Sequence, residues 1–337
     1  MIDSILNKIN RKKPERYNIL TFSTHEGYQT LLDKTGHNFF LFENDQTTKK
    51  WNRNFRPVTE NHTIISSVNA LNLRSFDFIL SHERFSQLGS AMKLARLSRM
   101  PIIHIEHVEP QDRWSEDQIN SMKNMSGDIN LFISEHNKKS WGIEDSTVIN
   151  HGIDTSKFKG WKPNKNKTVT YVVNYLKDRD YFCGYEVWLK VKEMVNNIDP
   201  EIKFELIGDN PGISQPENDI DVIIDKLSNT SCYINTSQLS PIPMSLLEAM
   251  SCGCPVVSTS KQEIPRIING QNGFCSNDIS DLTNKIVEIV NNQEKASAMG
   301  DEARKTIVEK FSLESFILNW NEVFDKAFNM KFGKKYA

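Results

Sequence analysis

The sequence has no long apolar run, which excludes several classes of membrane and secreted protein. Its longest apolar stretches are only a few residues long, such as Ile102-Ile103 and Val256-Val257, whereas a membrane-spanning helix needs about 20 apolar residues. Residues 1–6 read MIDSIL and show neither the long apolar core nor the small residues of a secretory signal. We therefore expect a cytoplasmic protein without an integral membrane segment.

Cysteine is scarce, and its arrangement suits neither a disulfide framework nor a zinc site. No C-x-x-C pair occurs, and no histidine pair lies at ligand spacing near a cysteine. The five cysteines are Cys183, Cys232, Cys252, Cys254 and Cys275. Reduced thiols are the expectation for such a chain.

Neither sign of charge dominates, since 41 Lys and Arg face 43 Asp and Glu for a formal net charge of −2. The molecule as a whole is therefore not a polycation built to coat nucleic acid. Basic residues do gather at both ends: Lys8, Arg11, Lys12, Lys13 and Arg16, then Lys326, Lys331, Lys334 and Lys335. Such clusters can bind anionic lipid at the inner face of a membrane, bind a phosphate backbone, or simply solubilise the termini.

Short β-branched or apolar runs alternate with helical patterns, which predicts parallel strands joined by crossover helices. In the first half, the predicted strands are 18–22, 38–42, 63–66, 76–80, 101–105, 131–134 and 146–149, with a helix over 28–34. A polar, turn-rich segment at 160–167 indicates a linker.

A second series of strands and helices follows the linker. Its predicted strands are 168–173, 203–207, 222–224, 232–235 and 255–259, and its last helices are 279–291, 294–309 and 313–328. The 337 residues suit two domains. The expected fold is α/β, with two doubly wound Rossmann-like domains facing a cleft, over residues 1–160 and 161–312.

Residues 240–257 combine a short predicted helix with polar side chains. Ser240 and Pro241 suit an N-cap and a first helical position, and Gly253 suits the end. The spacing places apolar and polar residues on opposite faces, with Leu246, Leu247 and Met250 on one and Ser245, Glu248 and Ser251 on the other. The helix start suits a diphosphate, and Glu248 suits ribose hydroxyls. From spacing alone, an ordinary amphipathic helix with a solvated Glu248 is favoured.

The same segment resembles the family 4 glycosyltransferases of GT-B architecture, whose signature is E-x-F-G-x-x-x-L-E-A-M-A-x-G-x-P-V-V. Residues 247–257 read LEAMSCGCPVV. Residues 264–274, IPRIINGQNGF, are similar to the family's I-P-E-I-I-x-D-G-x-N-G. Residues 206–212, LIGDNPG, and 150–158, NHGIDTSKF, are similar to its G-x-G-P turn and its N-G-V-D-x-x-x-F segment. Four matches in order are specific, whereas any one alone is not.

The resemblance implies a retaining transfer of sugar from a nucleotide diphosphate sugar to an acceptor hydroxyl, without a cofactor or a metal. The implied role is the synthesis of surface polysaccharide, lipopolysaccharide or glycolipid, with a carbohydrate or glycolipid acceptor. The implied donor-binding residues are Gly27, Lys177, Arg179, Gly208, Ser240, Ile242, Pro243, Met244, Ser245 and Glu248. The architecture also implies that the last helix, about 313–337, packs back onto the first domain.

Departures from the family pattern keep other functions open. Ser240 replaces the first Glu, which contacts the donor sugar, and Pro243 replaces a glycine and has no N–H to offer. Cys183-Gly184 stands where the family has Lys-Gly, so that Lys177 or Arg179 must supply the charge unless this is a solvated turn. A weakened nucleotide-sugar-binding scaffold, or a transferase acting on modified nucleic acid, remains an alternative.

The amino-terminal half matches the family more loosely. Gly27, after the first strand, resembles the glycine loop that lets backbone approach the donor, although ordinary turn chemistry explains it equally well. His107 follows a strand end where the family carries an active-site histidine, whereas His104 lies within the strand. We predict a catalytic role for His107 with Glu248, against the alternative of loop structure. Gln29, His82 and Arg84 are weaker, acceptor-side candidates.

Overall fold

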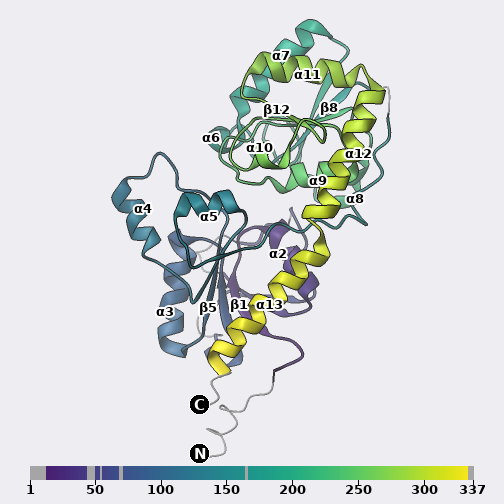
Figure 1. Cartoon of the computed structure of the whole chain (residues 1–337). Helices are drawn as coiled ribbons and strands as arrows, with labels where there is room; N and C mark the ends of the chain where they lie inside the picture. The colour runs from purple at the N-terminus through teal and green to yellow at the C-terminus, as the bar shows by residue number, and fades with distance from the viewer. Residues whose placement is uncertain (1–12, 44–49, 54, 68–70, 164–165, 333–337) are drawn as a thin grey trace, which may run out of the picture. The chain divides into compact units, whose positions relative to one another are not determined.

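A computed structural model describes residues 13–43, 50–53, 55–67, 71–163 and 166–332. The chain divides into two compact units (Figure 1). Unit 1 comprises Met1–Asn150 together with Glu314–Ala337, and unit 2 comprises His151–Leu313. Both are α/β units with parallel sheets, which confirms the predicted fold class.

Unit 1 is built on a seven-stranded sheet in the order β3-β2-β1-β4-β5-β6-β7, with every neighbouring pair parallel. Its central strands are buried on both faces, as expected of a parallel sheet covered by helices. The strands are β1 (Asn18–Phe22), β2 (Asn38–Phe42), β3 (His62–Ile65), β4 (Phe78–Ser81), β5 (Ile102–Glu106), β6 (Ile129–Phe132) and β7 (Thr147–Val148).

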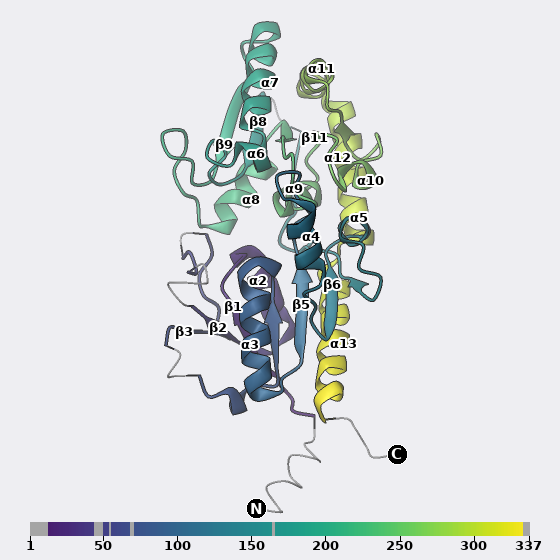
Figure 2. The same ribbon diagram turned by 90° about the vertical axis from the view of Figure 1, so that its left-hand side faces the viewer.

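Helices cover the two faces of this sheet. The α-helices are α2 (Glu26–Leu32), α3 (Gly89–Ser98), α4 (Glu116–Lys123), α5 (Glu135–Trp141) and α13 (Leu313–Phe332). Short 3-10 turns lie at η1 (Asp33–Thr35) and η3 (Leu73–Ser75), and a π-helical turn, η4, spans Arg84–Leu88. On β4, Phe78 stacks on Phe324 of α13, whereas the next residue, Ile79, packs in the cluster beneath α3. Since successive side chains of a strand alternate, α13 and α3 lie on opposite faces (Figure 2).

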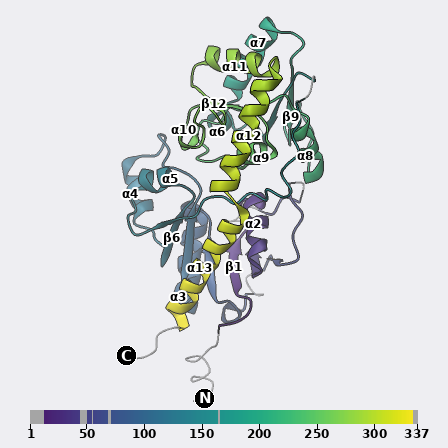
Figure 3. The same cartoon turned by 45° about the vertical axis from the view of Figure 1, so that its right-hand side comes forward.

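The last helix, α13, lies along the sheet of unit 1 (Figure 3). Aromatic contacts and hydrogen bonds hold it there. Trp320 Nε1 donates to the Tyr28 hydroxyl at 3.1 Å, and the Tyr17 hydroxyl donates to Asp325 at 2.7 Å. Tyr28 also meets Phe316 edge-on at 5.5 Å between ring centroids. Segments from the two ends of the chain therefore share one hydrophobic layer.

Unit 2 contains a five-stranded parallel sheet in the order β12-β11-β10-β8-β9. Its strands are β8 (Thr168–Val172), β9 (Lys203–Ile207), β10 (Cys232–Asn235), β11 (Val256–Ser258) and β12 (Phe274–Cys275). Its helices are α6 (Asp180–Cys183), α7 (Tyr185–Ile198), α8 (Ile220–Ser228), α9 (Met244–Cys252), α10 (Ile264–Ile267), α11 (Ile279–Val290) and α12 (Gln293–Lys310). Helix α11 packs against α7, and α12 packs against α9.

The predicted strand at 222–224 is wrong, because these residues lie inside α8. The Asp219 side chain caps this helix by accepting from the Asp221 N–H at 2.9 Å. Ile223 and Leu227, four residues apart, are its buried positions, which is helical spacing. The strand was predicted from the short β-branched run at 222–224, and such a run by itself does not distinguish a strand from a helix.

No helix in the described part of the chain is both long and apolar enough to cross a membrane.

A close helix contact in unit 2 gives a first test of the packing. A Cβ added at Gly300 on α12 would lie 2.0 Å from the carbonyl oxygen of Gly253, which ends α9. Gly300→Ala is expected to destabilise the protein by about 1–3 kcal/mol through overpacking, measured by chemical unfolding followed by circular dichroism. Gly89→Ala on α3 is the control, because its nearest neighbouring atom, on Met125, is 3.7 Å away. Equal stability of the two variants would contradict the contact.

Candidate active site

In unit 2, two loops at the carboxyl ends of β8 and β9 are locked together by close backbone approach. Gly208 has φ +118°, and a Cβ there would lie 2.5 Å from the Val173 carbonyl oxygen, so that only glycine fits. The Asn210 side chain accepts from the Leu176 N–H at 2.8 Å and donates to the Val173 carbonyl at 2.9 Å. These contacts hold both loops in fixed positions at the sheet edge where doubly wound sheets bind ligands.

The helix that follows β10 begins later than predicted. Its first residue is Met244 and its N-cap is Pro243, whereas the sequence suggested Ser240 and Pro241. The reason is steric: a residue before proline is pushed away from the helical region, so that Ile242, which precedes Pro243, cannot belong to the helix. Ile242 is instead buried in the connecting loop, where Ser240 is partly buried.

The start of α9 offers hydrogen-bond donors to a ligand. Pro243 provides no side-chain cap, and within the described residues no acceptor contacts the N–H groups of Met244 and Ser245. The Ser245 hydroxyl accepts from the buried Tyr233 hydroxyl at 3.0 Å, which fixes it at the same end of the helix. The helix therefore presents free donors and a positive dipole end at the sheet edge.

Glu248, one turn into α9, is buried rather than solvated. It is 8% exposed, and every residue from Leu246 to Cys252 is buried, so that the amphipathic pattern predicted for this helix is wrong. The predicted polar face packs inside the unit: the Ser251 hydroxyl donates to the Phe158 carbonyl at 2.8 Å. Burial, followed by the charge of Glu248, raises the pKa of the Cys252 thiol to about 12. Glu248 therefore lies inside the unit, one turn behind the uncapped start of the helix.

The predicted phosphate-binding cations lie in the loop after β8. Lys177 and Arg179 are exposed, and no carboxylate pairs with either one in the part of the chain that the structure describes. Cys183-Gly184 acts structurally instead, because Gly184 has φ +73° and a Cβ there would lie 2.0 Å from the Thr236 carbonyl oxygen. The phosphate-binding role of Lys177 and Arg179 stays a prediction.

Residues 178–180 read Asp-Arg-Asp, and the second aspartate takes part in local structure. The Asp180 carboxylate accepts from the Glu186 N–H at 2.9 Å, at the start of α7. Among the described residues, no group of three His, Cys, Asp or Glu side chains has the arrangement of a metal site.

In unit 1, His107 lies in an aromatic cluster beyond the end of β5. Strands β1, β4 and β5 are neighbours in the sheet, so that residues after each strand meet at one edge. Tyr28 meets His107 edge-on at 4.6 Å between ring centroids, and His25 lies 5.2 Å from it. His82 Nδ1 is 3.3 Å from His107 Nε2, which brings these two predicted site residues together.

Gln29 and Arg84 are engaged inside unit 1, in positions that do not favour the predicted acceptor contacts. Gln29 is fully buried and donates to the Phe22 carbonyl at 2.8 Å. Arg84 is 1% exposed, with its Nε 3.3 Å from a Glu106 oxygen. Gly27 lies in the first turn of α2, and a Cβ there would meet nothing within 4 Å, so that this position leaves room for a ligand.

Sequence reasoning missed Glu106, which lies beneath the histidine cluster. One of its carboxylate oxygens accepts from the N–H groups of His107 and Val108 at 3.1 and 3.2 Å. The other oxygen faces Arg84 and lies 3.6 Å from His104 Nε2. The available signal was a charged residue ending a strand that is otherwise buried, between two histidines.

The buried His82 gives an expected pH dependence of stability. Burial lowers the pKa of His82 to about 3, with smaller contributions from neighbouring histidines. Because the unfolded histidine binds its proton near pH 6.5, the stabilising contribution of neutral His82 is present above pH 6.5 and is lost as pH falls toward 3. Between pH 7 and 5 we expect a loss of about 2 kcal/mol from this residue.

Chemical unfolding at the two pH values measures this loss. His82→Leu should remove most of the loss of stability that is attributed to His82. His25→Gln, at an exposed position, should retain the wild-type pH dependence. An unchanged pH dependence in His82→Leu would contradict the assignment.

Part of the chain is similar in sequence to known glycosyltransferases. Residues 213–306 match the family model described as "Glycosyl transferases group 1". Poly(ribitol-phosphate) alpha-N-acetylglucosaminyltransferase of Staphylococcus aureus is 33% identical over 103 residues, which cover 29% of this chain and 21% of that protein. N-acetyl-alpha-D-glucosaminyl L-malate synthase of Bacillus anthracis is 22% identical over 300 residues, covering 70% of this chain and 78% of that protein.

The fold comparison covers more of the chain. The crystal structure of Anabaena HepE in complex with UDP and glucose superposes with a TM-score of 0.74 at 14% identity, over 92% of this chain and 100% of that one. The chain therefore has the GT-B fold. Its residues 213–306, which include α9 and Glu248, match the glycosyl transferases group 1 model, and this match confirms the resemblance seen in the sequence. The chain matches about a fifth of the length of the S. aureus relative.

Proposed function

We propose that the chain is a retaining glycosyltransferase that moves a sugar from a nucleoside diphosphate sugar to an acceptor hydroxyl. The observation that carries this proposal is the uncapped start of α9 with buried Glu248 one turn behind it, inside the segment that matches the family model. Free N–H groups suit a diphosphate, and a carboxylate suits ribose hydroxyls. A nucleoside diphosphate sugar has a diphosphate for the N–H groups and ribose hydroxyls for the carboxylate.

Several groups of unit 2 are proposed to bind the diphosphate of this donor. The N–H groups of Met244 and Ser245, with Lys177 or Arg179, stabilise the negative charge that develops on the leaving diphosphate, which is the expected main source of rate enhancement. The matched motifs contain no convincing covalent nucleophile. We therefore favour a front-face route, in which the leaving phosphate helps to remove the proton of the acceptor hydroxyl.

The acceptor is proposed to be a carbohydrate, a glycolipid or a cell-surface polymer. The name of the S. aureus relative states that it acts on poly(ribitol-phosphate), and this supports an acceptor of the cell envelope. In unit 1, His107 is proposed to hydrogen-bond a sugar hydroxyl, with its ring held by Tyr28 and His82.

A screen of nucleotide sugars tests the function directly. Hydrolysis of UDP-, GDP-, ADP- and dTDP-linked sugars is measured with the full chain, together with calorimetric titration of each nucleotide. UDP-sugars are the first candidates, since HepE was crystallised with UDP and glucose. The expected result is binding of one nucleotide and slow release of its sugar. Failure of all four nucleotides to bind would overturn the proposal.

We expect transfer to be independent of added metal and to retain the anomeric configuration. Turnover should persist in excess EDTA, because helix N–H groups and cations take the place of a metal at the diphosphate. Nuclear magnetic resonance of the first product formed should show the donor's anomeric configuration. Loss of turnover with EDTA that Mg²⁺ or Mn²⁺ restores would contradict the proposed mechanism.

A further inference from the structure

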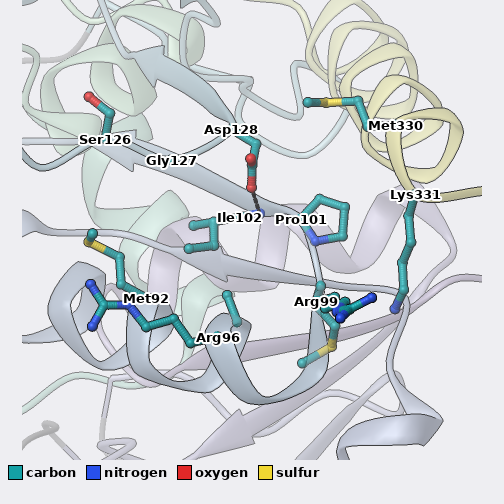
Figure 4. A pocket seen from close by; sticks show the side chains of 12 residues that line it. Met92, Arg96, Arg99, Pro101, Ile102, Ser126, Gly127, Asp128, Met330 and Lys331 are labelled. Atoms are coloured by element: carbon teal, nitrogen blue, oxygen red, sulfur yellow. Dashed lines mark hydrogen bonds between the residues drawn. The ribbon is translucent and has the colours of Figure 1, made fainter.

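Unit 1 contains a pocket at the amino-terminal ends of its strands, whereas the histidine cluster lies at their carboxyl-terminal ends. Its volume is about 460 Å³, and it lies where β5 and β6 begin, between the end of α3 and the end of α13 (Figure 4). His107 follows the far end of the five-residue strand β5, about 15 Å away at roughly 3.3 Å per residue. The pocket is therefore separate from the candidate active site.

Positive charge dominates this pocket. Arg96, Arg99 and Lys331 all line it, and Arg96 and Arg99 have no carboxylate partner among the described residues. Lys331 makes a long contact, 3.4 Å, to the Asp77 carbonyl. The single lining carboxylate, Asp128, already accepts from the Ile102 N–H at 2.7 Å. Arg99 and Lys331 extend toward the same side of the pocket, whereas Arg96 extends the other way along α3 (Figure 4). Cations near helix ends complement the helix dipole, and an anion bound beside Arg99 and Lys331 would offset their positive charge.

The rest of the lining is apolar. Met92, Met100, Pro101 and Met330 form much of the wall, and methionine adapts readily to a flexible apolar ligand. A ligand that fits this lining carries an anionic group at one end and an apolar body at the other.

We propose that this pocket binds a phosphate group carried on an apolar body. Guanidinium groups match phosphate oxygens in pairs, and they form charge-assisted hydrogen bonds with them. Two sources share this chemistry: the headgroup of an anionic phospholipid in a bilayer, and a soluble phosphoester. The proposal does not depend on the glycosyltransferase activity proposed above.

The pocket includes one residue of the two basic clusters at the chain ends. Of the charges counted in the sequence, Lys331 lines it, whereas Lys13 is neutralised by Asp325 at 2.7 Å. Lys8, Arg11, Lys12, Lys334 and Lys335 lie outside the described residues. Arg96 and Arg99, which the count of terminal charges omitted, supply the other two cations.

The experiment compares two arms with the full chain. One arm measures sedimentation with vesicles of phosphatidylglycerol in phosphatidylcholine, against pure phosphatidylcholine, at low salt. The other arm measures calorimetric binding of a soluble short-chain alkyl phosphate, with inorganic phosphate as the probe that lacks the apolar body. Binding in the vesicle arm alone assigns the lipid headgroup, and saturable binding of the small molecules assigns a soluble phosphoester.

Paired variants decide whether the pocket is responsible. The double variant Arg96→Gln and Arg99→Gln is expected to weaken binding about thirtyfold, from the typical contribution of two cations at an anionic surface. The control is Arg53→Gln with Arg113→Gln, an equal loss of charge at exposed positions outside the pocket. Nucleotide affinity should be unchanged in both, which separates this site from the donor site. Absence of binding in both arms, or an equal loss in the control, would overturn the proposal.

Discussion

Replacing Glu248 with alanine is expected to weaken nucleotide binding by about one to two powers of ten. Glu248 is buried behind the uncapped start of α9, so that a ribose hydroxyl bound there donates to a charged acceptor shielded from water. Such a hydrogen bond contributes about 1.5–3 kcal/mol. The fold should survive, because Leu246, Leu247 and Met250 keep their packing.

Calorimetric titration with the bare nucleotide and with the nucleotide sugar measures this effect. Ser240→Glu is the companion variant, because the family signature that this segment resembles has a Glu at the position of Ser240. It should leave the affinity for the bare nucleotide nearly unchanged and alter the preference among sugars. Wild-type affinity in a folded Glu248→Ala protein would remove the ribose assignment and favour a binding scaffold instead.

The architecture was predictable from the sequence because most strands are continuous apolar runs bounded by polar turns. β1, β2, β9 and β10 begin and end where the pattern places them. The strand predicted at 222–224 was wrong because these residues lie on a helix, whose inward positions, Ile223 and Leu227, are also apolar. The local composition is the same in both interpretations, and only the neighbouring Asp219 cap distinguishes them.

Sequence motifs suggested the candidate residues, but they did not show which polar side chains are used for packing inside the unit. Glu248 is a candidate because of its motif, but its burial was not predicted, because the residues that cover α9 are distant in sequence. The carbonyl of Phe158 and the guanidinium of Arg304, for example, meet near Ser251. Gln29 and Arg84 follow strand ends and looked like ligand contacts, yet each satisfies buried backbone carbonyls. Sequence position alone does not separate these uses of a polar side chain.

The buried pair of Glu106 and Arg84 carries the largest stability effect that we expect. Glu106 is 2% exposed and Arg84 1%, and their closest atoms are 3.3 Å apart. Burial lowers the pKa of Arg84, and the charge of Glu106 opposes this shift. Removing one partner leaves the other charge buried and unpaired, and Glu106→Ala is therefore expected to cost about 3–5 kcal/mol of stability.

A double-mutant cycle separates this pairing from simple loss of packing. Arg84→Met combined with Glu106→Leu should cost less than the sum of the two single variants, since neither charge is then left alone in the interior. The partly exposed pair of Lys226 and Glu205, 2.9 Å apart, is the control, and its coupling energy should stay below about 1 kcal/mol. Because Glu106 also accepts from the His107 N–H, its single variants should lower turnover as well as stability, measured at a temperature where they remain folded. Coupling no larger than that of the control pair would show that the charges beneath His107 do not hold each other in place.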